Sequence, residues 1–399
     1  MKKSLFATTA IVAAAAAASM APQQAAAQDD GGINLGVGGY YEFYYTASTQ
    51  DDLPGAGDER ADRVRQEGEI EFSGDTTLDN GIQVGVNVQL EAYTTGDQID
   101  EHYAFVEGSF GRMQIGAENS APYAMGYIAP SVGINANSPD YLPFNRATGI
   151  FPSTVIGVPL GGGSGDAPKL TYFTPRMAGF QLGASYAPDT ANTGGATQGF
   201  GLLQDDNAGV DQGRMFGVGA NYVNSFNGID LAVSAGYETV EDDDSTAGVP
   251  VSALFNLTNA QFNALGLSPT TTIGGSGVND NEDYESYGAG LNVGYAGFTV
   301  GGSINQSDDD GRDALAWDLG VSYETGPWGA SVTWLQTRVD FDNVSAEPVQ
   351  DTAVASLTYQ LGTGIALNGN LHYFAEDQDV QGGYDGDGYG ASAGLMLNF

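Results

Sequence analysis

The sequence contains no cysteine. A disulfide framework is therefore excluded, and hydrogen-bonded pairing or a large core must hold the fold together. After residue 27 the chain also lacks any stretch near the roughly 20 consecutive apolar residues that a membrane-spanning helix needs. A helical membrane protein is excluded, whereas a β-barrel is not, because its strands alternate apolar and polar residues.

Basic residues are scarce as well: 12 Lys and Arg stand against 50 Asp and Glu, a formal net charge of −38. A surface of this charge repels nucleic acid, which we exclude as a partner. High net charge with few aromatic residues would predict disorder. The chain has 21 Tyr and 18 Phe at periodic positions, and together with 59 Gly they favour a folded β protein.

The N-terminus has the pattern of an export signal. Lys2 and Lys3 precede an apolar run from Leu5 to Ala18, and an Ala-x-Ala site ends at Ala27 before an acidic stretch. This pattern predicts a secretory signal peptide over residues 1–27. Residues 28–399 then form the mature chain, which we interpret as one domain.

From residue 33 onward the chain repeats one unit, a strand with one apolar and one polar face. Between residues 82 and 92 the even positions are apolar and the odd positions are polar, which is the period of a two-faced strand. Many of these apolar stripes end in Tyr, Phe or Trp. Aromatic ends suit the two interfaces of a membrane.

The connections alternate in length as regularly as the strands alternate in polarity. Seven tight turns are predicted at 79–81, 111, 175–179, 224–228, 296–297, 326–327 and 362–364. Eight longer polar segments are predicted at 47–62, 94–99, 119–168, 188–213, 239–283, 306–313, 341–351 and 377–386. Fifteen connections give sixteen strands.

These patterns predict an all-β fold: a 16-stranded antiparallel transmembrane β-barrel of the outer membrane, with short periplasmic turns and long external loops. The alternative is a soluble β-sandwich or propeller, which would turn its apolar face inward and would need no aromatic bands at its strand ends. Sixteen strands leave an aqueous channel, so the expected activity is filtering by size and charge.

The polar face of the second strand predicts the wall of this channel. Its alternating charged residues cannot face lipid and must see water. The fifth strand adds inward charges in the same way, and the excess of acid predicts a preference for cations. The pore-lining candidates on these two strands are Arg63, Arg65, Glu67, Glu69, Glu71, Arg112 and Glu118.

The segment 119–168 contains prolines and aromatic residues but few charges. Because such a segment is poorly suited to water, we expect it to fold into the barrel and constrict the pore, with Asp140 and Arg146 as its pore-lining residues. The alternative is an external loop that packs on its neighbours.

No cofactor is expected. Acidic clusters at 241–244, 308–310 and 377–387 could bind calcium in external loops, although their spacing matches no helix-loop-helix calcium site, and metal ligands stay unassigned. The chain has two histidines, His102 and His372, and His372 alternates with asparagines on a polar wall. Without a base beside a nucleophile, we expect no enzyme activity.

Several segments together resemble a known family: the general trimeric porins of Gram-negative bacteria, most closely the alphaproteobacterial type. The resemblance covers the whole mature chain and depends on the order and spacing of its motifs. These are Thr77-Leu78-Asp79-Asn80-Gly81, Ser109-Phe110-Gly111, Lys169 to Pro175, Ala178-Gly179-Phe180 and the terminal Phe399.

The resemblance implies a homotrimer in outer-membrane lipid and lipopolysaccharide, inserted by the barrel-assembly machinery, that allows passive diffusion of small hydrophilic solutes. It also implies a basic pore wall of Arg63, Arg65 and Arg112 opposite Glu118 and Asp140. The third loop of this chain has fewer charges than the family pattern. Tyr40, Tyr44 and Phe173, inward in the predicted phase, leave a substrate-specific outer-membrane channel as the alternative.

Overall fold

The structure is a computed structural model that describes residues 32–51, 61–92, 99–137, 164–190, 213–241, 249–250, 272–273, 283–309, 311–342, 346–379 and 385–399. The predicted signal peptide, residues 1–27, lies outside the described residues.

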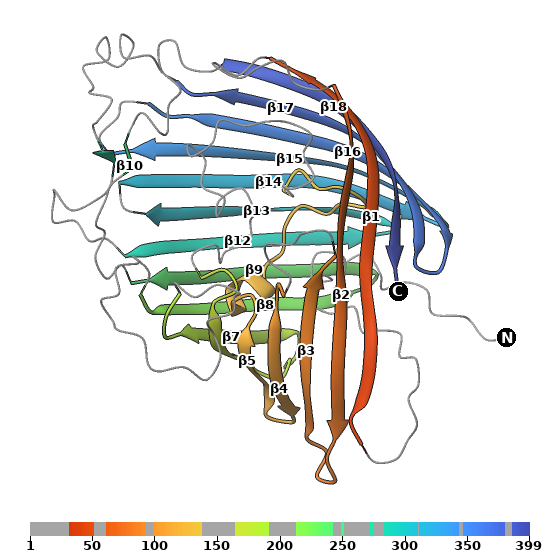
Figure 1. The fold of residues 1–399 in the computed structure, drawn as a ribbon, viewed down its shortest axis with the longest axis vertical. Helices are drawn as coiled ribbons and strands as arrows, with labels where there is room; N and C mark the ends of the chain where they lie inside the picture. Colours follow the sequence, from red (N-terminus) through yellow and green to blue (C-terminus); the bar gives the residue numbers. More distant parts are fainter. Residues whose placement is uncertain are drawn as a thin grey trace.

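Sixteen strands form a closed antiparallel barrel, as the sequence predicts (Figure 1). Strands β1 (Asn34–Gln50) and β18 (Asp385–Asn398) pair with each other and close the sheet. Strands β10 (Val249–Pro250) and β11 (Thr272–Ile273) form a separate two-stranded sheet, so β9 pairs directly with β12. The first eight barrel strands are β1 (Asn34–Gln50), β2 (Asp62–Thr77), β3 (Gln83–Glu91), β4 (His102–Gly108), β5 (Gly111–Ala117), β6 (Pro168–Phe173), β7 (Phe180–Ala187) and β8 (Met215–Phe226). The other eight are β9 (Ile229–Val240), β12 (Tyr284–Tyr295), β13 (Phe298–Asp309), β14 (Arg312–Thr325), β15 (Trp328–Phe341), β16 (Val349–Gly362), β17 (Ile365–Asp377) and β18 (Asp385–Asn398).

Two of the tight turns have positive φ at both central residues. In the turn between β8 and β9, Asn227 and Gly228 have φ of 52° and 81°. Between β12 and β13, Ala296 and Gly297 have φ of 52° and 87°. A two-residue hairpin of this hand needs positive φ at both positions, which Asn and Gly tolerate best.

One connection is shorter than the sequence predicts. The polar segment 306–313 was expected to be a long loop, but β13 continues to Asp309 and β14 begins at Arg312. Backbone pairing therefore extends beyond the apolar part of the strands, with Asp308 directly opposite Asp313. Polarity alone did not distinguish a loop from a hydrated strand end. The same row of cross-strand partners contains Glu285, Asp308, Asp313 and Asp340.

The two faces of the barrel have the polarity of a membrane protein. Large apolar side chains are exposed on the outside, such as Leu319 and Val332, whereas polar side chains such as Thr333 and Asn370 are buried inside. Aromatic rings contact each other toward both ends of the strands, at Trp328 and Tyr359 beside the short turns and at Tyr373 and Tyr389 on the side of the long loop between β17 and β18. This arrangement excludes the soluble alternative, which would bury its apolar face.

Helix is almost absent from the described residues. The single α-helix described, α1 (Ala121–Ala124), has four residues and follows β5. Within the described ranges, no helix is long and apolar enough to cross a membrane.

Candidate functional site

The inner wall is most highly charged on β1 and β2. The side chains of Arg63, Arg65, Glu67, Glu69 and Glu71 share the inward face of β2, because the intervening Val64 and Phe72 are exposed on the outward face. Their cross-strand partners on β1 are Thr46, Tyr44, Glu42, Tyr40 and Gly38.

Carboxylates converge on this wall. Glu42 lies opposite Glu67, and Glu69 lies opposite Glu91 on β3. One carboxylate oxygen each from Glu69, Glu91 and Asp100 lies within 4.8 Å of the others, and the Tyr40 hydroxyl donates to Glu69 at 3.1 Å. Three oxygen ligands at this spacing could hold a cation. Among the described residues, the described parts of the acidic external segments, which could bind calcium, contain no such grouping.

Arg112 does not join Arg63 and Arg65. It follows the tight turn between β4 and β5, whereas the other two arginines lie near the loop end of β2. Its guanidinium pairs with Glu107 at 3.0 Å and stands 4.0 Å from the centroid of the Phe105 ring. Because this ion pair compensates the charge, Arg112 adds little net positive potential to the lumen.

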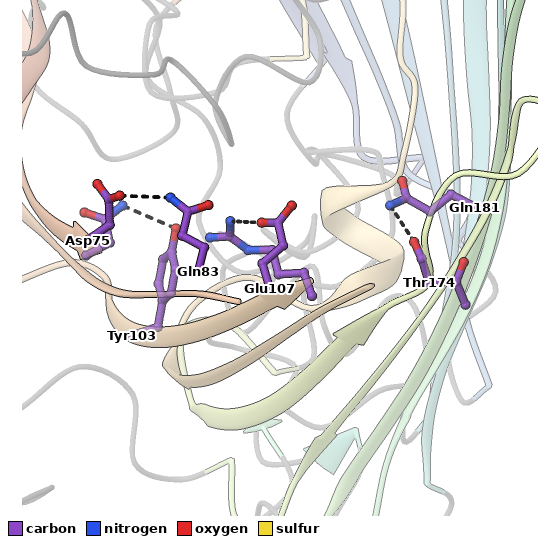
Figure 2. A network of polar contacts seen from close by, with 8 residues as sticks. Asp75, Gln83, Tyr103, Glu107, Thr174 and Gln181 are labelled. Carbon is purple, nitrogen blue, oxygen red and sulfur yellow. Dashed lines mark hydrogen bonds and ion pairs between the residues drawn. The ribbon is translucent and has the colours of Figure 1, made fainter. Parts of the chain in front are cut away.

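Polar contacts continue around the turn end of this wall. Figure 2 shows Gln83 donating to Asp75 at 2.9 Å, next to Tyr103 and Glu107. On the far side of α1 in the same view, Gln181 donates to the carbonyl oxygen of Thr174 at 3.1 Å. The lumen wall is therefore polar on both sides of the segment that begins with α1.

The described part of the segment 119–168 lies against the inner wall. Its backbone N–H groups donate to inward hydroxyl and carboxylate oxygens at distances from 2.8 to 3.2 Å. The donor and acceptor pairs are Ala121 and Ser185 on β7, Tyr127 and Ser234 on β9, Ala129 and Asp318 on β14, Val132 and Ser331 on β15, and Ala136 and Thr333 on β15. Asp140 and Arg146 lie outside the described residues.

The approach between this segment and the wall is close. A Cβ added at Gly290 on β12 would lie 1.8 Å from the Tyr127 carbonyl oxygen, so only glycine leaves room for the backbone there. Sequence reasoning did not identify these wall positions as loop contacts. The available signal was the small hydroxyl residues at inward positions of β7, β9 and β15, namely Ser185, Ser234, Ser331 and Thr333.

Asp318 on β14 accepts two hydrogen bonds from the segment. It is 4% exposed, and its Oδ2 accepts from the Ala129 N–H at 3.2 Å and the Asn137 side chain at 2.6 Å. Its Oδ1 accepts from the N–H and hydroxyl of Ser303 on the neighbouring strand. Four donors to one buried carboxylate satisfy it fully, which such a group requires.

Two carboxyl groups stand where the segment leaves β5. Glu101 is 7% exposed and accepts from Asn119 Nδ2 at 2.6 Å, while Glu118 accepts from the Asn119 N–H at 2.9 Å. Burial raises the pKa of both carboxyl groups, and the negative charges of their carboxylate neighbours, Asp166 among them, raise it further. These groups bind protons more readily than carboxyls in water.

His372 has the contacts of a wall residue. Its Nε2 lies 2.9 Å from Ser392 Oγ, the kind of pair that a hydrolase uses. Its Nδ1 is buried and has no hydrogen-bond partner among the described residues, so no third group orients the ring. A catalytic triad requires that group.

Comparison with known proteins agrees with this architecture. The sequence profile of the family described as Gram-negative porin matches residues 7–379. The chain belongs to the Gram-negative porin family. This porin is therefore an outer-membrane channel protein.

Two relatives of known sequence come from rickettsiae. A protein of Rickettsia bellii, described only as uncharacterised, is 24% identical over 335 residues, which are 74% of each chain. A similar protein of Rickettsia felis is 28% identical over 190 residues. That alignment covers 43% of each chain, so the porin matches less than half of this relative.

Solved structures share the fold at low identity. The porin aligns with an anion-selective porin from Comamonas acidovorans at 15% identity and a TM-score of 0.54, covering 92% of this chain and 100% of that one. It aligns with the outer-membrane channel DcaP of Acinetobacter baumannii at 12% identity and a TM-score of 0.57, covering 94% and 99%. Identities this low show the fold alone, so ionic selectivity depends on this porin's own residues.

Proposed function

We propose that this porin forms a water-filled pore for passive diffusion of small hydrophilic solutes and ions, with a preference for cations. The observation that carries the proposal is the pairing of carboxylates on the lumen wall, Glu42 with Glu67 and Glu69 with Glu91. Rings and rows of acidic side chains favour cations in a pore. Arg63 and Arg65 are fewer than the carboxylates beside them, and Arg112 is compensated by Glu107.

We further propose that the segment 119–168 constricts this pore. Support comes from the five backbone N–H groups between Ala121 and Ala136 that donate to inward side chains of the barrel. Asp140 and Arg146 remain the proposed charged residues of the constriction, and no catalysis is proposed.

The proposed assembly is a homotrimer in outer-membrane lipid and lipopolysaccharide. A structure that shares the fold, OmpT of Vibrio cholerae, is described in a trimer form. The two aromatic bands suit the membrane interfaces. The terminal Phe399 supports recognition by the barrel-assembly machinery during insertion.

A substrate-specific channel is the second candidate. Tyr40 and Tyr44 face inward on β1, and their hydroxyls donate to Glu69 at 3.1 Å and Glu42 at 3.0 Å. These bonds hold two aromatic rings in fixed positions beside carboxylates. Fixed rings of this kind would suit an aromatic or cationic solute.

A planar bilayer recording tests both candidates. We expect large open steps in potassium chloride and a reversal potential of the sign given by excess cation flux in a salt gradient. Anion preference would contradict the proposed selectivity. Small steps blocked by one class of solute would favour the substrate-specific channel, and absence of steps would contradict both.

A further inference from the structure

Both ends of the segment 119–168, which we call the pore loop, meet at one buried lysine. Ala117, the last residue of β5, is the cross-strand partner of Pro168, the first residue of β6, so the loop leaves and re-enters the barrel at adjacent points. Lys169 follows on the inward face opposite Gly116. Its side chain is 3% exposed, although lysine is almost never buried without partners.

The Lys169 ammonium bonds to both stems of the loop. Nζ donates to the carbonyl oxygen of Gly165 at 2.7 Å, on the returning stem, and to the carbonyl oxygen of Glu118, on the outgoing stem. An ammonium has three donors, so one lysine can join two carbonyls that are 47 positions apart in the chain numbering (165 − 118).

Carboxylates on both stems and on the wall interact with the same ammonium. Glu118 and Asp166 belong to the stems, Glu101 precedes β4, and Glu238 belongs to β9. Glu238 is fully buried, and its Oε1 accepts from the Ser164 N–H at 3.1 Å. The cation thus links the stems to one another and, through charge, to the barrel wall.

We propose that Lys169 is the positioning residue of the pore loop, tying its outgoing and returning stems together and fixing the height at which the loop crosses the lumen. The effect on current rests on the proposed constriction by residues 119–168. The link that Lys169 makes between the two stems does not depend on that constriction.

The test compares Lys169→Met with Lys169→Arg and with Arg176→Met. Arg176 is an exposed cation in the turn after β6 that donates to Gly179 and Gln181, remote from the stem carbonyls. Since Lys169→Met leaves buried carboxylates without their cation and can fail to fold, the double variant Lys169→Met with Glu238→Gln provides a second route. Arginine keeps a multidentate donor and should preserve the tie.

Amide hydrogen exchange and single-channel recording are measured on each variant. We expect Lys169→Met, or the double variant, to raise exchange about tenfold in residues 118–121 and 164–167 and to add current substates, with little change at residues 132–136, which β15 holds. Lys169→Arg and Arg176→Met should match the parent protein.

Stems that stay fully protected in a folded Lys169→Met or double variant would overturn the proposal. Faster stem exchange with an unchanged current would support the tie and contradict the constriction by the loop. Loss of protection over the stems in Arg176→Met would also overturn it, because removal of a cation that does not contact the stems would then have the same effect.

Discussion

Glu69 on β2 and Glu91 on β3 are direct cross-strand partners, and with Asp100 they bring three carboxylate oxygens within 4.8 Å of one another. Like charges placed directly opposite each other destabilise a sheet, so this row tends to attract mobile cations from the lumen. Removal of the carboxylate charges should therefore lower cation selectivity and raise the stability of the barrel.

The double substitution Glu69→Gln and Glu91→Gln should lower the ratio of cation to anion permeability by about twofold, because charged rows set pore selectivity. The same change should stabilise the barrel by roughly 0.2–1 kcal/mol. Reversal potentials and unfolding midpoints measure the two effects. Glu285→Gln, the same chemical change on the outer surface, is the control and should leave the reversal potential unchanged. An equal shift in both proteins would count against the lumen position of Glu69.

Two aspartates on β14 allow a matched comparison. Asp318→Asn removes a charge that accepts four hydrogen bonds from Ala129, Asn137 and Ser303, and it sets an amide N–H₂ against those donors. Hydrogen bonds to a charged group contribute about 1.5–3 kcal/mol each, so a loss of at least about 2 kcal/mol is expected. Unfolding in denaturant measures it, and current noise should increase as the loop loosens.

Asp313→Asn makes the same substitution five positions earlier on the same strand. Asp313 is exposed and lies between Asp308 and Asp340 on neighbouring strands. Relief of like-charge repulsion should stabilise the protein slightly at low salt, and the gain should shrink as salt screens the charges. If Asp318→Asn and Asp313→Asn destabilised the protein to the same extent, neither the hydrogen-bond donors of Asp318 nor the carboxylates beside Asp313 would determine the effect on stability.

Selectivity should depend on pH through Glu101 and Glu118. Burial raises the pKa of both groups, so they are largely neutral in acid and ionise as pH rises. Cation preference should therefore strengthen with rising pH in the parent protein and less so in Glu118→Gln. Reversal potentials across a pH series measure the difference.

The same pKa shifts have a consequence for stability. A carboxyl group whose pKa is raised by folding holds its proton more tightly in the folded state. Its contribution is most favourable below the unfolded pKa, near 4.3, and is lost as pH rises through the folded value. Glu118→Gln should reduce the loss of folding stability as pH rises. A pH profile that is identical in the variant would rule out Glu118 as a titrating group.

A charged substitution should destabilise the protein on the outward face and not on the lumen face. Val332 on β15 is 53% exposed on the apolar outer surface, so Val332→Arg should cost about 2–4 kcal/mol in a bilayer. Glu67→Arg, on the inward face of β2, should fold normally and shift selectivity toward anions. Unfolding in vesicles provides the comparison. Equal stability of the two variants would contradict the assigned faces.

Local pattern predicted most of the fold. The alternation of residues 82–92 fixed the faces of β3, and the turn residues near 228 and 297 fixed two hairpins, because strand period and turn conformation depend on neighbouring residues. The connection between Asp309 and Arg312 shows the limit. There the sequence predicts a longer loop, since acidic residues suit a hydrated strand end as well as a loop.

The sequence by itself determined a sixteen-stranded barrel with an acidic inner wall, because a period of two and the length of each connection can be read locally. Only the tertiary structure decided which wall holds the pore loop. Ala129 and Asp318 are 189 positions apart, and they meet because the sheet closes on itself. Folding of the loop likewise brought both of its stems to Lys169.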